Sequence, residues 1–228
     1  MKALCVIPAR GGSKRVPRKN IREFCGKPII GWSIEAAQES RYFERIIVST
    51  DDEEIAKVAQ DWGAEVPFMR PTELSDDMTG TIPVIAHAID MTEQQDGPYD
   101  AVCCIYATAP FIRQLDIAAG KQHIENGWAF AFPVTEFPAP IFRSFRVQPN
   151  GGVEMFFPKQ FATRSQDLET AYHDAGQFYW GTAAAWKSGQ PLFGPNSAAI
   201  QVTRRVVQDI DTEEDWIIAE RMFQIGHE

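Results

Sequence analysis

The chain begins with a short apolar run that ends in a Gly-Gly turn surrounded by positive charge. Residues 3–8 are apolar and close with a proline, a pattern that predicts a short buried strand, and Gly11 and Gly12 follow almost at once. Residues 10–27 carry seven lysines and arginines against one acid, whereas the whole chain has a formal net charge of −9. A compact cluster of basic residues in an acidic chain favours binding of a small polyanionic ligand over a long nucleic acid, which requires a broad basic face.

Short apolar runs alternate with amphipathic segments through the first part of the chain. The expected strands are 3–8, 44–49, 64–69 and 100–106, and the expected helices are 28–39, 52–62 (opened by Asp51 or Asp52), 81–95 and 113–126. Such alternation predicts an α/β fold, in which a mainly parallel sheet is covered by helices on both faces. Ligands of these sheets bind beyond the carboxyl ends of the strands, so the basic turn should lie at the binding edge.

The sequence changes character after residue 130, where prolines and glycines interrupt the helical pattern. Residues 141–148 and 153–157 alternate around a Pro-Asn-Gly-Gly turn, which predicts a β-hairpin. Because an isolated hairpin is only marginally stable in water, we expect residues 136–165 to protrude and to pack on a second subunit as a dimerisation element; the alternative is that they fold back on their own domain. A strand at 198–210 and a helix at 212–224 complete one expected domain spanning residues 1–228.

The composition excludes several classes of protein. With 228 residues, of which 44% are hydrophobic, the chain is ordinary for a globular protein. No apolar run approaches the ~18 residues needed to span a bilayer, and the N-terminus shows no small-residue cleavage site, so we expect a cytoplasmic protein without a membrane partner. None of the four cysteines forms a C-x-x-C pair, which favours free thiols over disulfides or zinc, and the acidic balance disfavours nucleic acid as a partner.

The basic turn differs from two familiar phosphate-binding loops. It contains Lys14 but lacks the later Gly-Lys-Ser/Thr of a Walker A loop, and Pro17 interrupts the direct entry into a helix that a dinucleotide fingerprint needs. What remains is a flexible turn whose amide groups can face phosphate oxygens, with Arg10, Lys14 and Lys19 available to neutralise a triphosphate. The alternative is a solvated basic loop, but so many mutually repelling cations add little to stability.

Two aspartates near the end of the sequence form a second candidate site. If residues 198–210 and their continuation are a strand, Asp209 and Asp211 share a face, because side chains two positions apart in a strand point the same way. Two carboxylates suit Mg²⁺, which keeps water and substrate phosphate in its other positions. In the alternative, Asp211 or Thr212 caps the helix that follows. We expect the basic turn and these aspartates to meet around a magnesium nucleotide.

Two further segments are rich in polar residues. Residues 163–180 combine arginine, glutamine, histidine and aromatic side chains, as expected for a pocket that binds a polyhydroxylated acid. His173 beside Asp174 is a candidate general base, although neighbours of this kind are more often structural. Residues 70–77 form a polar loop that leads toward a helix N-terminus, which suits contacts to a base or phosphate, with a simple turn as the alternative.

Four sequence motifs together resemble one enzyme family. They are I-P-A-R-G-G-S-K-R-x-P-R-K-N at 7–20, S-T-D-D at 49–52, R-P-x-x-L-S-D-D at 70–77 and D-I-D-T-E-E-D at 209–215. With these motifs the chain resembles the acylneuraminate cytidylyltransferases, which make CMP-activated nine-carbon sugar acids, and the resemblance covers essentially its whole length. The segments at 104–110 and 164–180 are similar to the branch of the family that uses pseudaminic acid. Residues 105–110 read Ile-Tyr-Ala-Thr-Ala-Pro where sialic acid synthetases usually have Leu-Gln-Pro-Thr-Ser-Pro, and Ser165 stands where those enzymes have arginine.

The resemblance implies a Rossmann-like nucleotidyltransferase fold and a homodimer that transfers CMP from CTP to the anomeric hydroxyl of pseudaminic acid, with release of pyrophosphate and with Mg²⁺ as cofactor. It implies catalytic roles for Arg10, Lys14, Lys19 and Asp211, and a metal site at Asp209 and Asp211. The expected nucleotide contacts are Ala9, Gly11, Gly12, Ser13, Asn20, Arg70, Ser75 and Asp77. The expected sugar contacts are Tyr106, Thr108, Arg164, Gln166, His173, Gln177 and Tyr179. The alternatives are N-acetylneuraminic or legionaminic acid as acceptor, a different nucleotide base, and a non-catalytic CTP-binding protein.

Overall fold

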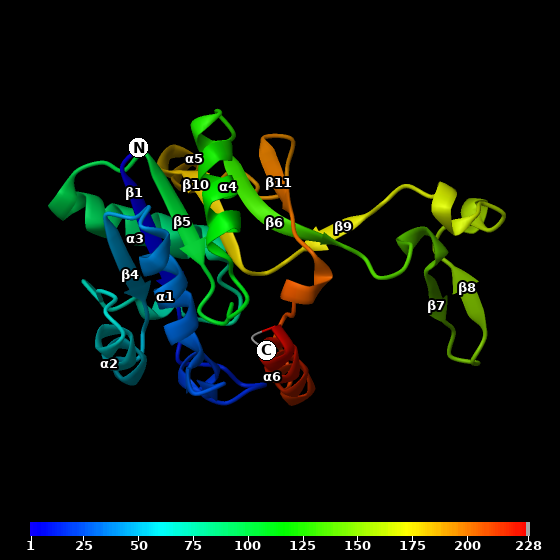
Figure 1. The fold of residues 1–228 in the computed structure, drawn as a ribbon, viewed down its shortest axis with the longest axis horizontal. Coiled ribbons are helices and arrows are strands. Elements are labelled where there is room, and N and C mark those ends of the chain that lie inside the picture. Colours follow the sequence, from blue (N-terminus) through cyan, green and yellow to red (C-terminus); the bar gives the residue numbers. More distant parts are fainter. Residues whose placement is uncertain (227–228) are drawn as a thin grey trace.

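A mixed seven-stranded sheet forms the centre of the protein in a computed structural model that describes residues 1–226 (Figure 1). Six strands run in the order β11-β6-β10-β5-β1-β4, and β9 pairs with the last residues of β6. The bounds are β1 Ala3–Pro8, β4 Arg45–Ser49, β5 Ala101–Ile105, β6 Phe130–Glu136, β9 Tyr172–Asp174, β10 Phe178–Thr182 and β11 Ser197–Gln201. The last two residues of the expected 1–228 domain lie outside the described part.

Five of the seven strands run in the same direction, as the sequence predicts, whereas β10 and β9 run against them. Strands β4, β1 and β5 are parallel, as are β6 and β11, whereas β10 lies between β5 and β6 and is antiparallel to both. The predicted strand at 64–69 is wrong. That segment makes isolated bridges at Glu65 and Met69, and Pro67 between them has no N–H to donate to a ladder.

Helices cover both faces of the sheet, which confirms the α/β prediction. On one face lie α1 (Ile29–Ser40), α2 (Glu53–Asp61) and α4 (Gln114–Glu125). On the other lie α3 (Thr81–Asp96) and the short α5 (Ala183–Ser188).

Strand β1 shows why its sequence is apolar throughout. Ala3, Cys5 and Ile7 belong to the core layer on the first face, and Leu4 and Val6 belong to the layer on the second. All five residues are fully buried. Because successive side chains of a strand point to opposite faces, a strand covered on both sides has no polar position.

A third apolar cluster joins α6 (Glu213–Gly226) to the segment that follows the basic turn. Trp216 and Phe223 of α6 pack edge-on against Phe24, with ring centroids 5.5 and 5.4 Å apart. Phe24 belongs to a small hairpin formed by β2 (Glu23–Phe24) and β3 (Lys27–Pro28). The cluster therefore holds two distant parts of the sequence side by side.

The chain between β11 and α6 leaves the sheet. The predicted strand at 198–210 is correct only as far as Gln201, after which a single 3-10 turn spans Arg204–Val206. Thr203 accepts a hydrogen bond from the Arg205 N–H and so opens this turn, which ends the strand. Residues 207–211 belong to no helix or strand, so Asp209 and Asp211 are not on one face of a strand as expected. Other single 3-10 turns lie at Lys19–Ile21, Thr72–Leu74, Ile141–Arg143, Pro158–Gln160 and Ser165–Asp167.

Residues 137–171 form an arm that projects from the sheet between β6 and β9 (Figure 1). The arm contains the predicted hairpin, with β7 (Phe145–Val147) and β8 (Val153–Met155) shorter than expected. Gly151 in the connecting turn has φ +84°, which explains the Asn-Gly signal. Large apolar side chains on the arm are 55–72% exposed, namely Phe145, Val147, Val153, Phe156 and Phe161.

Two expectations from composition can be compared with the structure. Cys5, Cys25, Cys103 and Cys104 are all free thiols, as predicted. Within residues 1–226, no helix combines the length and the hydropathy that a membrane span requires.

Candidate active site

The basic turn is fixed to the carboxyl ends of β1 and β4. Ala9 N–H donates to the Ser49 carbonyl at 2.9 Å, and Gly11 N–H donates to Asp51 Oδ1 at the same distance. The Asn20 amide donates to the Arg10 carbonyl at 2.9 Å, which ties the end of the turn back to its start. The predicted nucleotide-binding residues Ala9, Gly11 and Asn20 therefore shape the turn through their own hydrogen bonds.

Gly11 lies directly against the N-terminus of α2. A Cβ atom at Gly11 would be 2.6 Å from Oδ2 of Asp52, whereas a Cβ at Gly12 would have no atom nearer than 3.9 Å. Of the two residues expected to open this helix, Asp52 is the cap, and it accepts hydrogen bonds from the N–H groups of Glu54 and Ile55. The Arg18 guanidinium hydrogen-bonds the same carboxylate, and this contact and the two N–H groups lower the pKa of Asp52 to about 2.

Carboxylates from two other segments hold the cations of the turn. Arg10 and Lys14 both pair with Asp77, with Lys14 Nζ 2.5 Å from Oδ2, and they lower the pKa of Asp77 to about 2. Arg15 pairs with Asp211 at 2.8 Å. Lys19 Nζ donates to the Ile210 carbonyl at 2.6 Å and lies 3.7 Å from Asp211.

These groups line one open cleft of about 490 Å³. Its walls come from the basic turn, the start of α3, the segment after β5 and the segment before α6. The predicted site residues that it brings together are Arg10, Ser13, Lys14, Lys19, Asn20, Arg70, Asp77, Tyr106, Thr108 and Asp211. The parallel strands β1, β4 and β5 all end at this edge, which is where the sequence places the site.

Of the two aspartates expected to bind a metal, Asp211 lines the cleft, whereas Asp209 does not. Burial, and then the charge of Asp211, raise the pKa of Asp209, so a cation beside the pair would favour its ionised form. Thr212 and Asp215 form a reciprocal cap at the start of α6, with N–H to oxygen distances of 3.2 and 2.8 Å, so the Asp211 side chain is not the cap. Within residues 1–226, no group of three or more His, Cys, Asp or Glu side chains could hold a metal by itself. Mg²⁺ suits such a site because it takes water and phosphate oxygens as further ligands.

Arg70 is buried at the floor of the cleft. Its guanidinium donates to the Ser49 hydroxyl at 3.1 Å and also to the Ser49 carbonyl, and burial lowers its pKa. Ser75 Oγ donates to the Pro71 carbonyl at 3.0 Å and does not line the cleft. Both residues thus hold the 70–77 loop in place, and Arg70 also borders the cleft.

A second cavity of about 390 Å³ adjoins the cleft through Thr81 and Tyr106. The Tyr106 hydroxyl lies 3.0 Å from the Thr81 hydroxyl, and the rings of Tyr106 and Tyr179 are 5.2 Å apart. The Tyr179 hydroxyl donates to Asp174. Leu192 and Phe193 complete the wall, and sequence reasoning misses these two, because they follow α5 in a stretch without a motif. Asp174 lies in the 164–180 motif, but the motif predicts it only as a partner of His173.

Four of the predicted sugar contacts line neither cavity. His173 lies in β9 with Nδ1 2.9 Å from the Asp174 carbonyl and its ring against Phe137. Gln177 is 3% exposed and donates to the Val206 carbonyl. Arg164 and Gln166 lie on the arm, where Arg164 pairs with the neighbouring Asp167.

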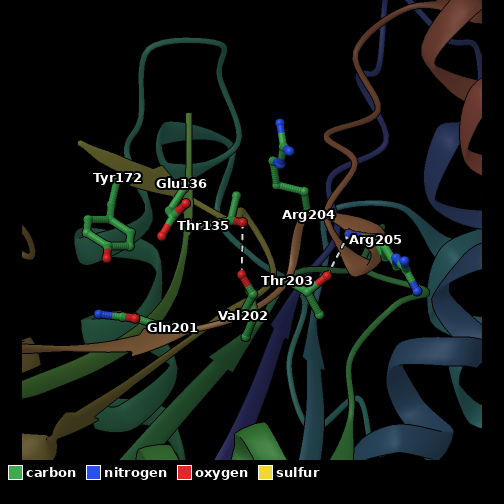
Figure 2. A pocket seen from close by; sticks show the side chains of 8 residues that line it. All are labelled: Thr135, Glu136, Tyr172, Gln201, Val202, Thr203, Arg204 and Arg205. Carbon is green, nitrogen blue, oxygen red and sulfur yellow. Dashed lines mark hydrogen bonds between the residues drawn. The ribbon is translucent and has the colours of Figure 1, made fainter. Parts of the chain in front are cut away.

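A further cavity of about 650 Å³ lies at the root of the arm, and none of the predicted site residues lines it (Figure 2). Its lining comes from the ends of β6 and β11, from β9 and from the 3-10 turn at Arg204–Val206. It includes Glu136, Tyr172, Arg204 and Arg205. One dashed line in Figure 2 marks the hydrogen bond from the Thr135 hydroxyl to the Val202 carbonyl. The side chains predicted to bind phosphate, Arg10, Lys14 and Lys19, line the cleft, which we therefore regard as the candidate active site.

Comparison with known proteins shows the family to which the chain belongs. The sequence matches the family described as cytidylyltransferase over residues 4–204, so the chain belongs to the cytidylyltransferase family, whose members are nucleotidyltransferase enzymes. It is 47% identical over 230 residues to the pseudaminic acid cytidylyltransferase of Campylobacter jejuni serotype O:2, covering 100% of this chain and 99% of the relative. It is 33% identical over 238 residues to the CMP-N,N'-diacetyllegionaminic acid synthase of Legionella pneumophila, covering 100% and 99% of the two chains.

A solved structure shows the same fold at low sequence identity. The structure of CMP:2-keto-3-deoxy-manno-octonic acid synthetase complexed with CTP matches with a TM-score of 0.73, over 99% of this chain and 100% of that chain, at 17% identity. The family predicted from the motifs and the nucleotidyltransferase fold are both confirmed.

Proposed function

We propose that this protein transfers CMP from CTP to the anomeric hydroxyl of a nine-carbon sugar acid, with pseudaminic acid as its substrate. The observation that carries the proposal is the cleft in which Arg10, Lys14, Lys19 and Asp211 converge. The full-length similarity to a pseudaminic acid cytidylyltransferase supports the choice of acceptor. The free thiols and the use of CTP are consistent with a cytoplasmic location.

In this proposal the basic turn binds the triphosphate. Arg10 and Lys14 exchange the Asp77 carboxylate for phosphate oxygens, and the backbone amides around Gly12 face the same charge. The oxygen of the anomeric hydroxyl forms a bond to the α-phosphorus and its proton leaves to water, while the bond between that phosphorus and the bridging oxygen of the β-phosphate breaks. Lys19 and the other cations stabilise the charge that pyrophosphate carries away, and the cleft holds the two substrates in line.

Asp209 and Asp211 would hold Mg²⁺, with the remaining ligands from water and phosphate oxygens. When bound, the metal supplies neutralisation of phosphate charge and acidifies an attacking hydroxyl. Arg15 and Lys19, which contact Asp211, keep that carboxylate directed toward the cleft.

The cavity that adjoins the cleft suits the sugar acid. Its walls combine aromatic surfaces with the hydroxyls of Tyr106 and Thr81 and the carboxylate of Asp174. Phe193 is 62% exposed at its rim, where an apolar part of the substrate can cover it.

We further propose that the arm pairs two copies of the chain. Its exposed apolar side chains favour burial in an interface, as predicted for residues 136–165. Arg164 and Gln166 lie on the arm beyond the lining of either cavity, so they contact the sugar acid from the second copy.

Mixing two inactive variants tests this shared site. Lys19→Met removes a cation of the cleft and Arg164→Ala removes a residue of the arm. If each site combines the cleft of one copy with the arm of the other, mixed dimers regain one intact site, and about a quarter of the wild-type activity returns on random reassociation. No recovery on mixing would contradict the shared site.

A pyrophosphate-release assay tests the function itself. We expect release only with CTP, Mg²⁺ and the correct acceptor, and the assay compares CTP with UTP and GTP, and pseudaminic with legionaminic and N-acetylneuraminic acids. Lys19→Met and Asp211→Asn should each lower the rate by roughly 10²–10³, since each removes a preorganised charge contact. CTP binding without pyrophosphate release from any acceptor would instead identify a non-catalytic CTP-binding protein.

A further inference from the structure

Gln177 is a buried residue that hydrogen-bonds two segments next to the active-site cleft, one after β5 and one before α6. It precedes β10 and is 3% exposed. Its backbone carbonyl accepts a hydrogen bond from Tyr106 N–H at 2.8 Å, next to the segment that lines the cleft after β5. Its side-chain amide donates to the Val206 carbonyl, at the start of the segment that leads to the aspartates.

The segment that Gln177 contacts has little regular structure of its own. Residues 207–211 belong to no helix or strand, so side-chain contacts hold them in place. Val207 packs against the first core layer, and Asp211 pairs with Arg15 and donates its N–H to Asp215. At the far end, Ile210 is buried in the third apolar cluster and its carbonyl accepts the hydrogen bond from Lys19. At the near end, the Gln177 amide contacts Val206, so a shift of Gln177 would displace Asp209 and Asp211 relative to the cleft.

The chemistry of the amide explains why glutamine suits this position. Val206 offers a carbonyl, which requires a donor, and a carboxylate of the same size would place two acceptors together. The amide oxygen of Gln177, Oε1, is buried and accepts no hydrogen bond from residues 1–226. The contact to Val206 is therefore what fixes the orientation of the side chain.

We propose that Gln177 is a positioning residue, which places the aspartate segment for metal and nucleotide binding instead of contacting the sugar acid. The inference rests on the proposed function only in taking Asp209 and Asp211 as the metal site. It also gives a role to a residue for which sequence resemblance implied a direct substrate contact.

The test compares Gln177→Met, which keeps the size of the side chain but removes the donor, with Thr135→Val. Thr135 makes a matched contact, since its buried hydroxyl donates to the Val202 carbonyl at 2.9 Å, earlier in the same connection and before the 3-10 turn. Both variants lose one buried hydrogen bond between a side chain and a backbone carbonyl, so both should lose similar stability.

The measurement is the affinity for CTP by calorimetry, with Mn²⁺ and with chelator, together with the KM for the sugar acid. We expect Gln177→Met to reduce the Mn²⁺-dependent gain in CTP affinity by about fivefold, as the loss of one neutral hydrogen bond would do, and to leave the KM for the sugar acid unchanged. Thr135→Val should leave the Mn²⁺-dependent gain at the wild-type value, and Gln177→Glu should not restore it.

Two results would overturn the proposal. A higher KM for the sugar acid with an unchanged Mn²⁺ effect would make Gln177 a substrate contact. An equal loss of the Mn²⁺ effect in Thr135→Val would make both residues general supports of the fold. A wild-type protein that binds CTP with Mn²⁺ but releases no pyrophosphate would refute the proposed function, while the calorimetric comparison would still decide the role of Gln177.

Discussion

Replacing Gly11 by alanine should damage the basic turn, whereas the same change at Gly12 should be mild. A Cβ atom added at Gly11 would lie 2.6 Å from Oδ2 and 3.0 Å from Cβ of Asp52. At Gly12 the nearest atom, on Arg10, is 3.9 Å away. Neither glycine has a positive φ, so the difference between the two variants is one of space and not of backbone strain.

The free-energy cost of Gly11→Ala depends on the contacts that hold Asp52 in place. Its carboxylate caps α2 and pairs with Arg18, so it cannot move without loss of those contacts. Overpacking of this kind costs about 1–3 kcal/mol, and loss of a helix cap costs about 1 kcal/mol. If the turn moves instead, Arg10 and Lys14 move with it, and CTP binding weakens by about tenfold for each 1.4 kcal/mol.

The assay combines urea denaturation with calorimetric titration of CTP for both variants. For each variant we add the loss in free energy of unfolding to the loss in free energy of CTP binding. This sum should be about 1–3 kcal/mol larger for Gly11→Ala than for Gly12→Ala. Adding Asp52→Ser to Gly11→Ala removes the crowded Oδ2 but keeps a capping hydroxyl, so the double variant should lose less than the sum of the single ones. Agreement of the two alanine variants within about 0.5 kcal/mol in both measurements would refute the steric argument.

Three further predictions concern stability and assembly. Gly120→Ala should lower the unfolding free energy by about 2–3 kcal/mol in urea, because its Cβ would collide with the buried ring of Trp180; an unchanged midpoint would contradict this. The pKa of Asp52 lies at about 2, below its ordinary value, so its pairing with Arg18 stabilises the fold above about pH 4 and is lost as the pH falls toward 2. Asp52→Asn should therefore lose about 1–2 kcal/mol at neutral pH and show a shallower acid limb in denaturation. Phe156→Ser should shift a dimer toward monomer in sedimentation, and an unaltered dimer would exclude this side chain from the interface.

The features that the sequence predicts well depend on neighbours along the chain. Strand β1 and helices α1 to α4 follow from local periodicity, and the cap of α2 follows from the aspartates at its start; the short α5 is not predicted. The basic turn lies at the end of β1, so its place at the edge of the sheet follows from the alternation alone.

The features that it predicts poorly depend on contacts between distant segments. Strand β10 is antiparallel between β5 and β6, and no local pattern in 178–182 specifies those neighbours. The expected strand through Asp209 ends at Gln201, because Thr203 opens a 3-10 turn there. The role of Gln177 is hidden for the same reason, since Val206 is far from it in sequence.

The packing of α6 against Phe24 has a consequence for the timing of synthesis. The ribosome makes the cationic turn well before Asp211 and the helix that supports it. A nascent chain that still lacks Asp211 and α6 lacks one wall of the cleft and the helix that packs against Phe24. We therefore expect catalytic competence to arise late during translation, so that an unfinished chain has no means of consuming CTP.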